Sequence, residues 1–299
     1  MMKKGKKNSN YYNKLQSYGY IFILPSVIMF SIFSVYPMLN SLYLSLFEWN
    51  LVSKKIFIGF KNFINLFSNA EFLNSYKITF HFTFFSMLII MILAFFLALA
   101  FTTKIRFKNI LQSTIFLPVI FTTVAVGVIW NFMFQNTGLL SYIFALIFKL
   151  NIPWLTSTKV APYAMILVHV WKMTGFYMVL FLAGLLDIPE TYYEAAKLDG
   201  ASFWQTLIYI TIPQLKNTIV LVSVSIIIFS FGTFDLQYVM TAGSPAGSTK
   251  VLGLLIYKEA FEFNKFGYAS AISVVFFITL LFFSIIQFGL YNKSESEAE

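Results

Sequence analysis

The sequence predicts an all-α integral membrane protein with six transmembrane helices, and two observations carry this prediction. The first is composition: of 299 residues, 59% are hydrophobic, 20% are aromatic and only 11% are charged. An ordinary soluble domain carries roughly 25% charged residues, so this chain has too few to cover a water-exposed surface. The bilayer is therefore expected to be its solvent.

The second observation is the length of the apolar blocks. A helix needs roughly 20 apolar residues to cross the hydrocarbon core. Six blocks reach that length, namely residues 21–46, 78–101, 110–134, 161–186, 218–240 and 268–291. The first is too long for the apolar core of a signal peptide and no small-residue cleavage site follows it, so we expect an uncleaved span. A shorter run, 138–150, is expected to form a helix at the membrane surface.

These blocks give one predicted membrane domain, residues 18–291, between polar tails at 1–17 and 292–299 that we expect to be disordered. An N-terminus in the cytoplasm puts five lysines of the first tail and the basic residues 104, 106 and 108 on the inner side. The outer loops also hold seven lysines, so the charge bias is small. The expected location is the plasma membrane, with several spans.

Composition excludes several other classes. The net charge of +9 is scattered between apolar blocks, which argues against a nucleic-acid surface. There is no Cys and the histidines are His81 and His169, so we expect no metal or other cofactor in this chain. The turn G-S-P-A-G-S-T-K at 243–250 lacks the order of a phosphate-binding loop. We therefore expect neither an ATPase site nor an enzyme.

The longest loop predicted on the cytoplasmic side, residues 187–216, has helical signals. It reads DIPETYYEAAKLDGASFWQTLIYITIPQLK. The opening from Asp187, with Pro189 near the first helical position, predicts a helix start, and Gly200 suits the left-handed position that ends a helix. Ser202 can cap a second helix, which Pro213 is expected to end. By pattern alone, a docking element and an ordinary surface hairpin are equally compatible with this helix–bend–helix unit.

Polar side chains within two spans are candidates for a solute pathway, because such residues are costly in a membrane. Hydroxyl, imidazole and charged groups near aromatic rings suit a sugar. The candidates are His169, Lys172, Tyr177, Phe229, Ser230, Thr233, Asp235 and Tyr238. Positions 169, 172 and 173 lie on one helical face. Lys172 and Asp235 could instead pair with each other in a structural role.

The loop also carries a recognisable spacing. Glu194-Ala195-Ala196, then Gly200, then Ile210 and Pro213 resembles the E-A-A loop of ABC importer permeases, whose pattern is E-A-A, three residues, G, nine residues, I-x-L-P; Ile212 replaces the Leu. The segments FDLQYVMTAGSP and FGYASA resemble the carbohydrate branch that includes the maltose and glycerol-phosphate importers, and within it the F-type subunit. Residues 242–245 depart from the adjacent glycines common in that branch.

This resemblance implies a type I, MetI-like permease fold that forms half of a translocation pathway. It implies that the loop docks on a cytoplasmic ATPase through Glu194, Ala195, Ala196, Asp199, Gly200, Ile210 and Pro213. The implied partners are a second homologous permease subunit, two ATPase subunits that bind ATP and Mg²⁺, an extracellular solute-binding protein and membrane lipid. The implied location is a bacterial plasma membrane.

Other functions stay open at this stage. The same machinery could import glycerol phosphate, a polyol or an anionic sugar, with Lys172 as the charge partner. A channel or secondary carrier would favour several paired charges within spans or inverted repeats, which the sequence does not show. A membrane enzyme would need a carboxylate or His cluster, and the one acidic cluster lies in the E-A-A loop.

Overall fold

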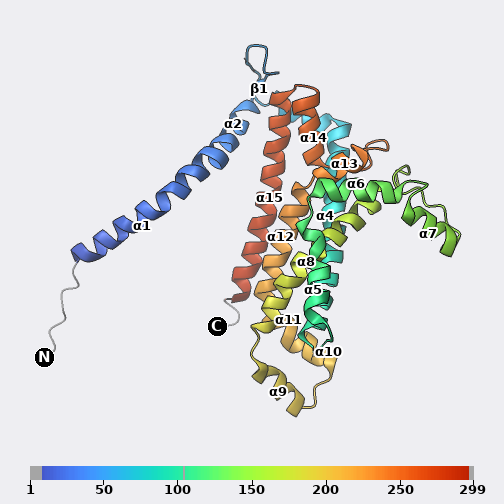
Figure 1. Cartoon of the computed structure of the whole chain (residues 1–299). Coiled ribbons are helices and arrows are strands. Elements are labelled where there is room, and N and C mark those ends of the chain that lie inside the picture. The colour runs from blue at the N-terminus through green and yellow to red at the C-terminus, as the bar shows by residue number, and fades with distance from the viewer. Residues whose placement is uncertain (1–8, 104, 296–299) are drawn as a thin grey trace.

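The computed structural model describes residues 9–103 and 105–295, and most of them are helical. Five helices are long and apolar enough to cross a membrane, and a bent helix pair raises the number to six, as predicted. The long helices lie side by side in an elongated bundle, with a short two-stranded hairpin at one end and the helices α9 and α10 at the other (Figure 1).

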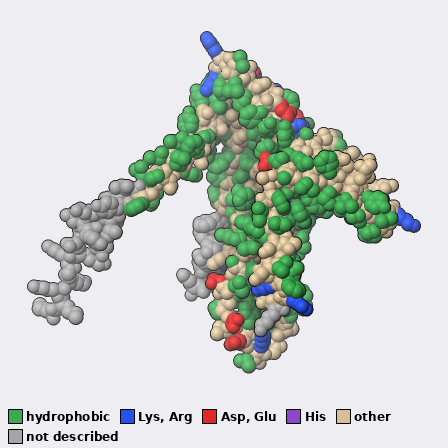
Figure 2. Space-filling view, in the orientation of Figure 1, with side chains coloured by type: hydrophobic (Ala, Val, Ile, Leu, Met, Phe, Trp, Pro, Cys, Tyr) green, Lys and Arg blue, Asp and Glu red, His purple; other side chains and the backbone are tan. Residues whose placement is uncertain are grey.

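The first span stands apart from this bundle (Figure 1). It consists of α1 (Ser9–Phe30), a π-helical segment η1 (Ser31–Val35) and α2 (Tyr36–Leu44). Between Phe22 and Leu44 the only buried residue is Leu44, and the Phe22 side chain is 83% exposed. Figure 2 shows this arm covered with hydrophobic side chains. Because α1 begins at Ser9, the expectation of a disordered tail is wrong for residues 9–17.

The hairpin and a short helix connect the arm to the bundle. The strands β1 (Phe47–Glu48) and β2 (Ile56–Phe57) pair antiparallel, and α3 (Lys61–Ser68) follows them. The buried amide of Asn62 donates to the carbonyls of Ser45 and Phe47 at 2.8 and 3.0 Å, which fixes α3 against the end of α2. These hydrogen bonds fix the connection between the arm and the bundle.

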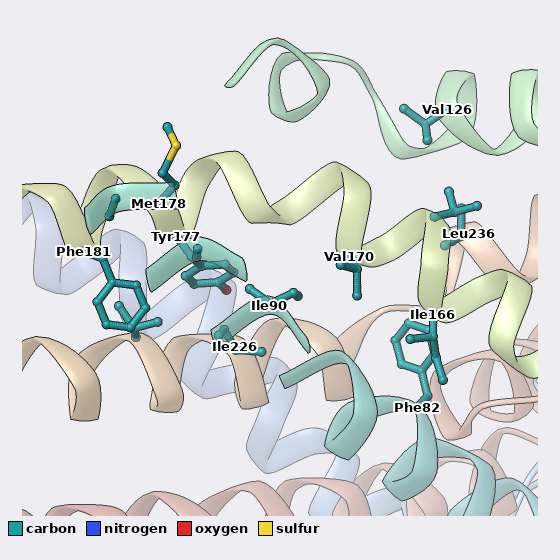
Figure 3. Packing of buried hydrophobic residues seen from close by; sticks show 14 of the residues in the cluster. Phe82, Ile90, Val126, Ile166, Val170, Tyr177, Met178, Phe181, Ile226 and Leu236 are labelled. Carbon is teal, nitrogen blue, oxygen red and sulfur yellow. The ribbon is translucent and has the colours of Figure 1, made fainter. Parts of the chain in front are cut away.

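Two helices form the centre of the bundle. They are α4 (Ala70–Thr102) and α8 (Ala161–Leu186), and α12 (Lys216–Gly232) packs beside them. Figure 3 shows Ile90 from α4, Tyr177 and Phe181 from α8 and Ile226 from α12 gathered in this core. Small residues allow close approach: a Cβ on Gly175 would clash with the carbonyl of Ile115.

The third predicted block, 110–134, is not one helix. It is divided into α5 (Lys108–Ile120) and α6 (Thr123–Phe134), and the helical stretch of spanning length in this region is Thr123–Phe148. The chain leaves the helical conformation at Phe121 and Thr122, three residues after Pro118, which removes a backbone donor. The predicted short helix at 138–150 is present as α7 (Leu139–Phe148) and projects away from the bundle (Figure 1).

The fifth block, 218–240, is also interrupted. The helix pair Phe203–Gln214 and Lys216–Gly232 is bent by 70°, and a second break at Thr233 and Phe234 separates α12 from α13 (Asp235–Thr241). The bundle ends with α14 (Leu252–Tyr257), the π-helical η3 (Lys258–Glu262) and the long α15 (Phe266–Glu295). Since α15 continues to Glu295, residues 292–295 are helical and not disordered as expected.

Candidate functional site

The loop after α8 folds as the predicted helix–bend–helix unit. It contains α9 (Glu190–Leu198), then Gly200 with a φ of +71°, then α10 (Phe203–Thr206), η2 (Leu207–Thr211) and α11 (Ile212–Gln214). Ser202 caps α10: its hydroxyl accepts from the Gln205 N–H, and the Gln205 side chain accepts from the Ser202 N–H at 2.7 Å. The left-handed Gly200 and this reciprocal cap fix the bend.

Two details of the loop differ from the prediction. Asp187 does not start α9, because it is the C-terminal cap residue of α8, and the position before α9 is occupied by Pro189. Pro213 does not end the second helix either. It lies within the last turn of the continuous helix Phe203–Gln214, and the chain bends one residue later, after Gln214.

Most of the predicted loop residues are exposed. Glu194, Ala195, Asp199, Gly200 and Pro213 are exposed, Ile210 is half-buried, and Ala196 is buried. Leu198 is 89% exposed at the end of α9.

A hollow of about 580 Å³ separates α9 from the ends of α4 and α8. Glu190, Tyr193, Glu194 and Lys197 line it, and these positions lie on one face of α9. The Tyr193 hydroxyl shares a 3.4 Å hydrogen bond with the hydroxyl of Thr211, so α9 is tied to η2 across the bend. The unit is thus held to the bundle while its outer face stays open.

At mid-bundle, five of the eight predicted pathway residues come together around a second hollow, of about 290 Å³. We call it the solute cavity. The predicted residues that line it are His169, Lys172, Phe229, Thr233 and Asp235. The His169 imidazole is buried and shares a 2.9 Å hydrogen bond with the Ser230 hydroxyl. The Phe229 side chain, by contrast, is 57% exposed. Ser230 does not line the cavity itself, and it positions the His169 ring through this hydrogen bond.

The solute cavity lies where the two interrupted spans meet. Thr123 at the start of α6 lines it, and so do Gly232 and Thr233 at the end of α12. Thr122 caps α6 by accepting from the Ala125 N–H at 3.3 Å. Asp235 occupies the first position of α13, where a carboxylate is favoured by the helix dipole. Both breaks thus turn polar groups toward one space.

Lys172 has a structural role that the sequence did not predict. Its ammonium donates to the carbonyls of Val119 and Phe121 at 3.3 and 2.9 Å, where α5 ends. An ammonium has three N–H donors, so one remains for the cavity. Among the described residues the ion pairs are Glu71–Lys250 and Glu259–Lys265, so the alternative pairing of Lys172 with Asp235 is not formed.

Two candidates lie away from the solute cavity. Tyr177 is 1% exposed and packs in the core with Ile90 and Ile226, as Figure 3 shows. Tyr238 packs edge-on against Tyr257 with ring centroids 5.2 Å apart. Neither side chain lines the cavity. The position of a residue along a helix does not determine which neighbouring helix its side chain contacts.

Sequence reasoning missed some cavity residues. Met173, whose position had been placed on the face of His169, lines the cavity, and Ile228 and Leu236 add apolar wall. Thr123 lies inside the apolar block 110–134, which the sequence predicts to be one helix. The paired threonines at 122 and 123 after Pro118 are the signal that could have found it, since Thr is a good N-cap.

Comparison with known proteins identifies the family of this chain. The model of the family described as "Binding-protein-dependent transport system inner membrane component" matches residues 90–294. The chain belongs to this family. It is therefore a multi-pass membrane permease of a binding-protein-dependent transport system.

Curated relatives of this permease match over nearly all of its length. The trehalose/maltose transport system permease protein MalF of Thermococcus litoralis is 31% identical over 270 residues, covering 90% of this chain and 91% of the relative. The lactose transport system permease protein LacF of Rhizobium radiobacter is 32% identical over 276 residues, covering 90% and 92%.

Solved structures confirm the predicted type I permease fold. A chain of a bacterial alginate ABC transporter in complex with a pentasaccharide-bound periplasmic protein superimposes with a TM-score of 0.79 at 22% identity. The superposition covers 94% of this permease and 96% of that chain. At this identity the likeness concerns the fold.

The contacts of Lys172 lead to a prediction for stability. Lys172→Met should remove the two charge-assisted hydrogen bonds to the carbonyls of Val119 and Phe121, at a cost of about 1.5–3 kcal/mol for each bond. Thermal unfolding of the purified permease in detergent should therefore occur at a lower temperature. Lys159→Met is the control, since Lys159 is exposed. Equal unfolding temperatures for the two variants would contradict the capping role.

Proposed function

We propose that this permease is one half of the translocation pathway of an ATP-driven carbohydrate importer. The feature that best supports the proposal is the solute cavity, which two broken helices and a buried His–Ser pair form in the same chain as the E-A-A loop. Broken helices that line a cavity are a recurrent way to build a solute site in a membrane. The names of the relatives, which include trehalose/maltose and lactose permeases, point to sugars.

The charges of the solute cavity favour a neutral solute. Lys172 and Asp235 both line it, and their opposite charges offset each other. Two carbonyls already engage the Lys172 ammonium, which leaves less of its charge for an anion. A hydroxyl-rich solute can use the remaining N–H, the Asp235 carboxylate and the Thr233 hydroxyl together. These groups favour a neutral sugar over glycerol phosphate or an anionic sugar.

The E-A-A loop is proposed to dock on the ATPase subunits, which supply ATP, Mg²⁺ and the hydrolysis that this chain is not expected to perform. The exposed Glu194 offers a carboxylate for a polar contact, and Leu198 an apolar one. Gly200 sets the angle between α9 and α10. Rigid-body movement of the docked ATPases would then move α8 and α12, which flank the cavity. This docking requires the N-terminus to be in the cytoplasm.

A second homologous permease subunit is proposed to complete the pathway. At the solute cavity, Phe229 is 57% exposed and offers apolar surface for a second subunit to cover. The α1 arm also leaves its own bundle (Figure 1). From Phe22 to Phe30 all its side chains are exposed, and most of them are apolar. Packing of the arm on the second subunit would cover this surface. An extracellular solute-binding protein is proposed to deliver the sugar to the opposite end from α9.

The choice of solute can be tested in the reconstituted complex. The permease and its partner subunits in proteoliposomes should hydrolyse ATP faster with maltose, trehalose or lactose and the cognate binding protein. Glycerol 3-phosphate should have no effect, because the cavity has no free net positive charge. Stimulation by glycerol 3-phosphate and by none of the sugars would overturn the carbohydrate assignment.

Gly200 gives a test of coupling that depends on backbone geometry alone. Apart from its two chain neighbours, none of the described residues has an atom within 4 Å of where a Cβ would be, so a side chain has room and only the φ of +71° is restrictive. Gly200→Pro cannot adopt this φ and should abolish sugar-stimulated ATP hydrolysis while membrane insertion is kept.

The matched control for this position is Gly200→Asn, because Asn tolerates the left-handed region. It should retain most of the stimulated activity. Full transport by Gly200→Pro in proteoliposomes would exclude the docking assignment, and loss of activity in both variants would point to side-chain size instead of the bend.

The arm can be tested by photo-crosslinking. A photoreactive residue in place of Met29, which is 58% exposed on α1, should form a crosslink to the second permease subunit in the assembled complex. The same residue in place of Leu146, 66% exposed on α7, serves as the control. If Met29 crosslinks only to lipid, the arm does not pack on the partner.

A further inference from the structure

A third hollow lies far from α9, at the outer end of the bundle. Its volume is about 390 Å³, and it is bounded by the last turn of α6, residues 154–156 and the last turn of α13. Figure 1 shows α6 and α13 at the end of the bundle opposite α9. From Thr123 to Asn131, α6 rises by about 12 Å, so the hollow is separate from the solute cavity.

The lining of this hollow differs chemically from that of the solute cavity, because none of its residues is charged. One wall is aromatic: the Trp154 indole stacks on Phe134 with ring centroids 5.0 Å apart. The other walls carry amides and hydroxyls, among them those of Gln135, Asn136 and Thr156. Aromatic surface beside neutral groups that both donate and accept hydrogen bonds suits a polyhydroxylated ligand.

Hydrogen bonds hold the frame of the hollow in place. The Asn131 amide donates to the Met240 carbonyl at 2.6 Å, which joins α6 to α13, and the Gln135 amide donates to the Asn131 side chain at 3.2 Å. On the other side, the hydroxyls of Thr241 and Thr249 lie 2.7 Å apart, and Thr249 donates to the Ser244 carbonyl at 2.9 Å. The site is therefore formed before any ligand arrives.

Several polar groups in the hollow still have unused hydrogen-bonding capacity. Among the described residues, no partner is found for the side chains of Asn136, Thr156 and Ser244, and all three are exposed. Gln135 uses one N–H and keeps its carbonyl oxygen. The structural bonds thus involve the base of the hollow, and the groups that remain available lie at its rim.

We propose that this hollow, the outer subsite, binds one ring of a neutral sugar before the sugar reaches the solute cavity. The inference rests on the proposed carbohydrate function. Its volume is near the lower end of the range of about 300–1,000 Å³ for small-molecule pockets, which fits a single ring. The absence of charge from its lining makes it selective against anionic sugars, whose charge would find no partner there.

The test is transport by the full complex with its binding protein in proteoliposomes. The sugar is the one of maltose, maltotriose, trehalose and lactose that the unmodified complex transports best. The double variant Asn136→Ala/Thr156→Val removes two rim groups. The matched control Asn151→Ala/Thr158→Val changes the same residue types at exposed positions nearby that do not line the hollow.

The double variant should raise KM for the sugar by roughly tenfold, as expected for two hydrogen bonds, with kcat unchanged. The control should leave both constants unchanged, and basal ATP hydrolysis should be normal in both. An unchanged KM in the double variant would overturn the outer subsite while leaving the carbohydrate function intact.

Two other outcomes also decide the matter. If the double variant instead raises the concentration of binding protein needed for half-maximal rate, the hollow is a protein contact and the subsite is wrong. If the unmodified complex transports none of the four sugars, the carbohydrate function fails, and the outer subsite fails with it.

Discussion

The need of every backbone polar group for a partner within the membrane is the constraint on which the site depends. Hydrocarbon offers no hydrogen bonds, so a helix can be interrupted only where protein or a polar cavity satisfies the released groups. This permease interrupts two spans, at residues 121–122 and 233–234, and both interruptions face one cavity. Lys172 donates to the carbonyls at the end of α5, and Thr122 caps the start of α6. Lys172, which satisfies the backbone at the first of these interruptions, thus also lines the solute cavity.

This explains why a charged residue is tolerated in α8. Lys172 would be costly in an apolar span. Here its ammonium exchanges water for two carbonyl oxygens and the polar lining of the cavity. The same side chain therefore stabilises the fold and lines the cavity.

Much of the architecture could be predicted from the sequence, because long apolar blocks and turn residues act locally. The bend at Gly200 and the cap at Ser202 follow from the preferences of single residues and were predicted correctly. The interruptions within the spans were not, since α5 and α6 read as one apolar run. Proline at 118 marks a weak point, yet only tertiary contacts determine that the helix stops three residues later.

The candidate site shows the same division between local and tertiary information. His169 and Lys172 share a helical face and both reach the cavity, as periodicity predicts. Tyr177 lies in the core because α4 and α12 cover it, and no local pattern contains that fact. The outer subsite combines residues from α6, α13 and the segment between α7 and α8, so sequence order gives no signal for it.

The exposed arm has a consequence for the amount of this permease in a cell. Residues 22–30 of α1 are all exposed, so their packing adds little to the stability of the isolated chain. Whatever covers that surface stabilises the folded state by mass action, so stability rises with the concentration of the partner. With the proposed second subunit as that partner, permease made in excess of it remains in the less stable, unassembled form, which is more open to proteolysis.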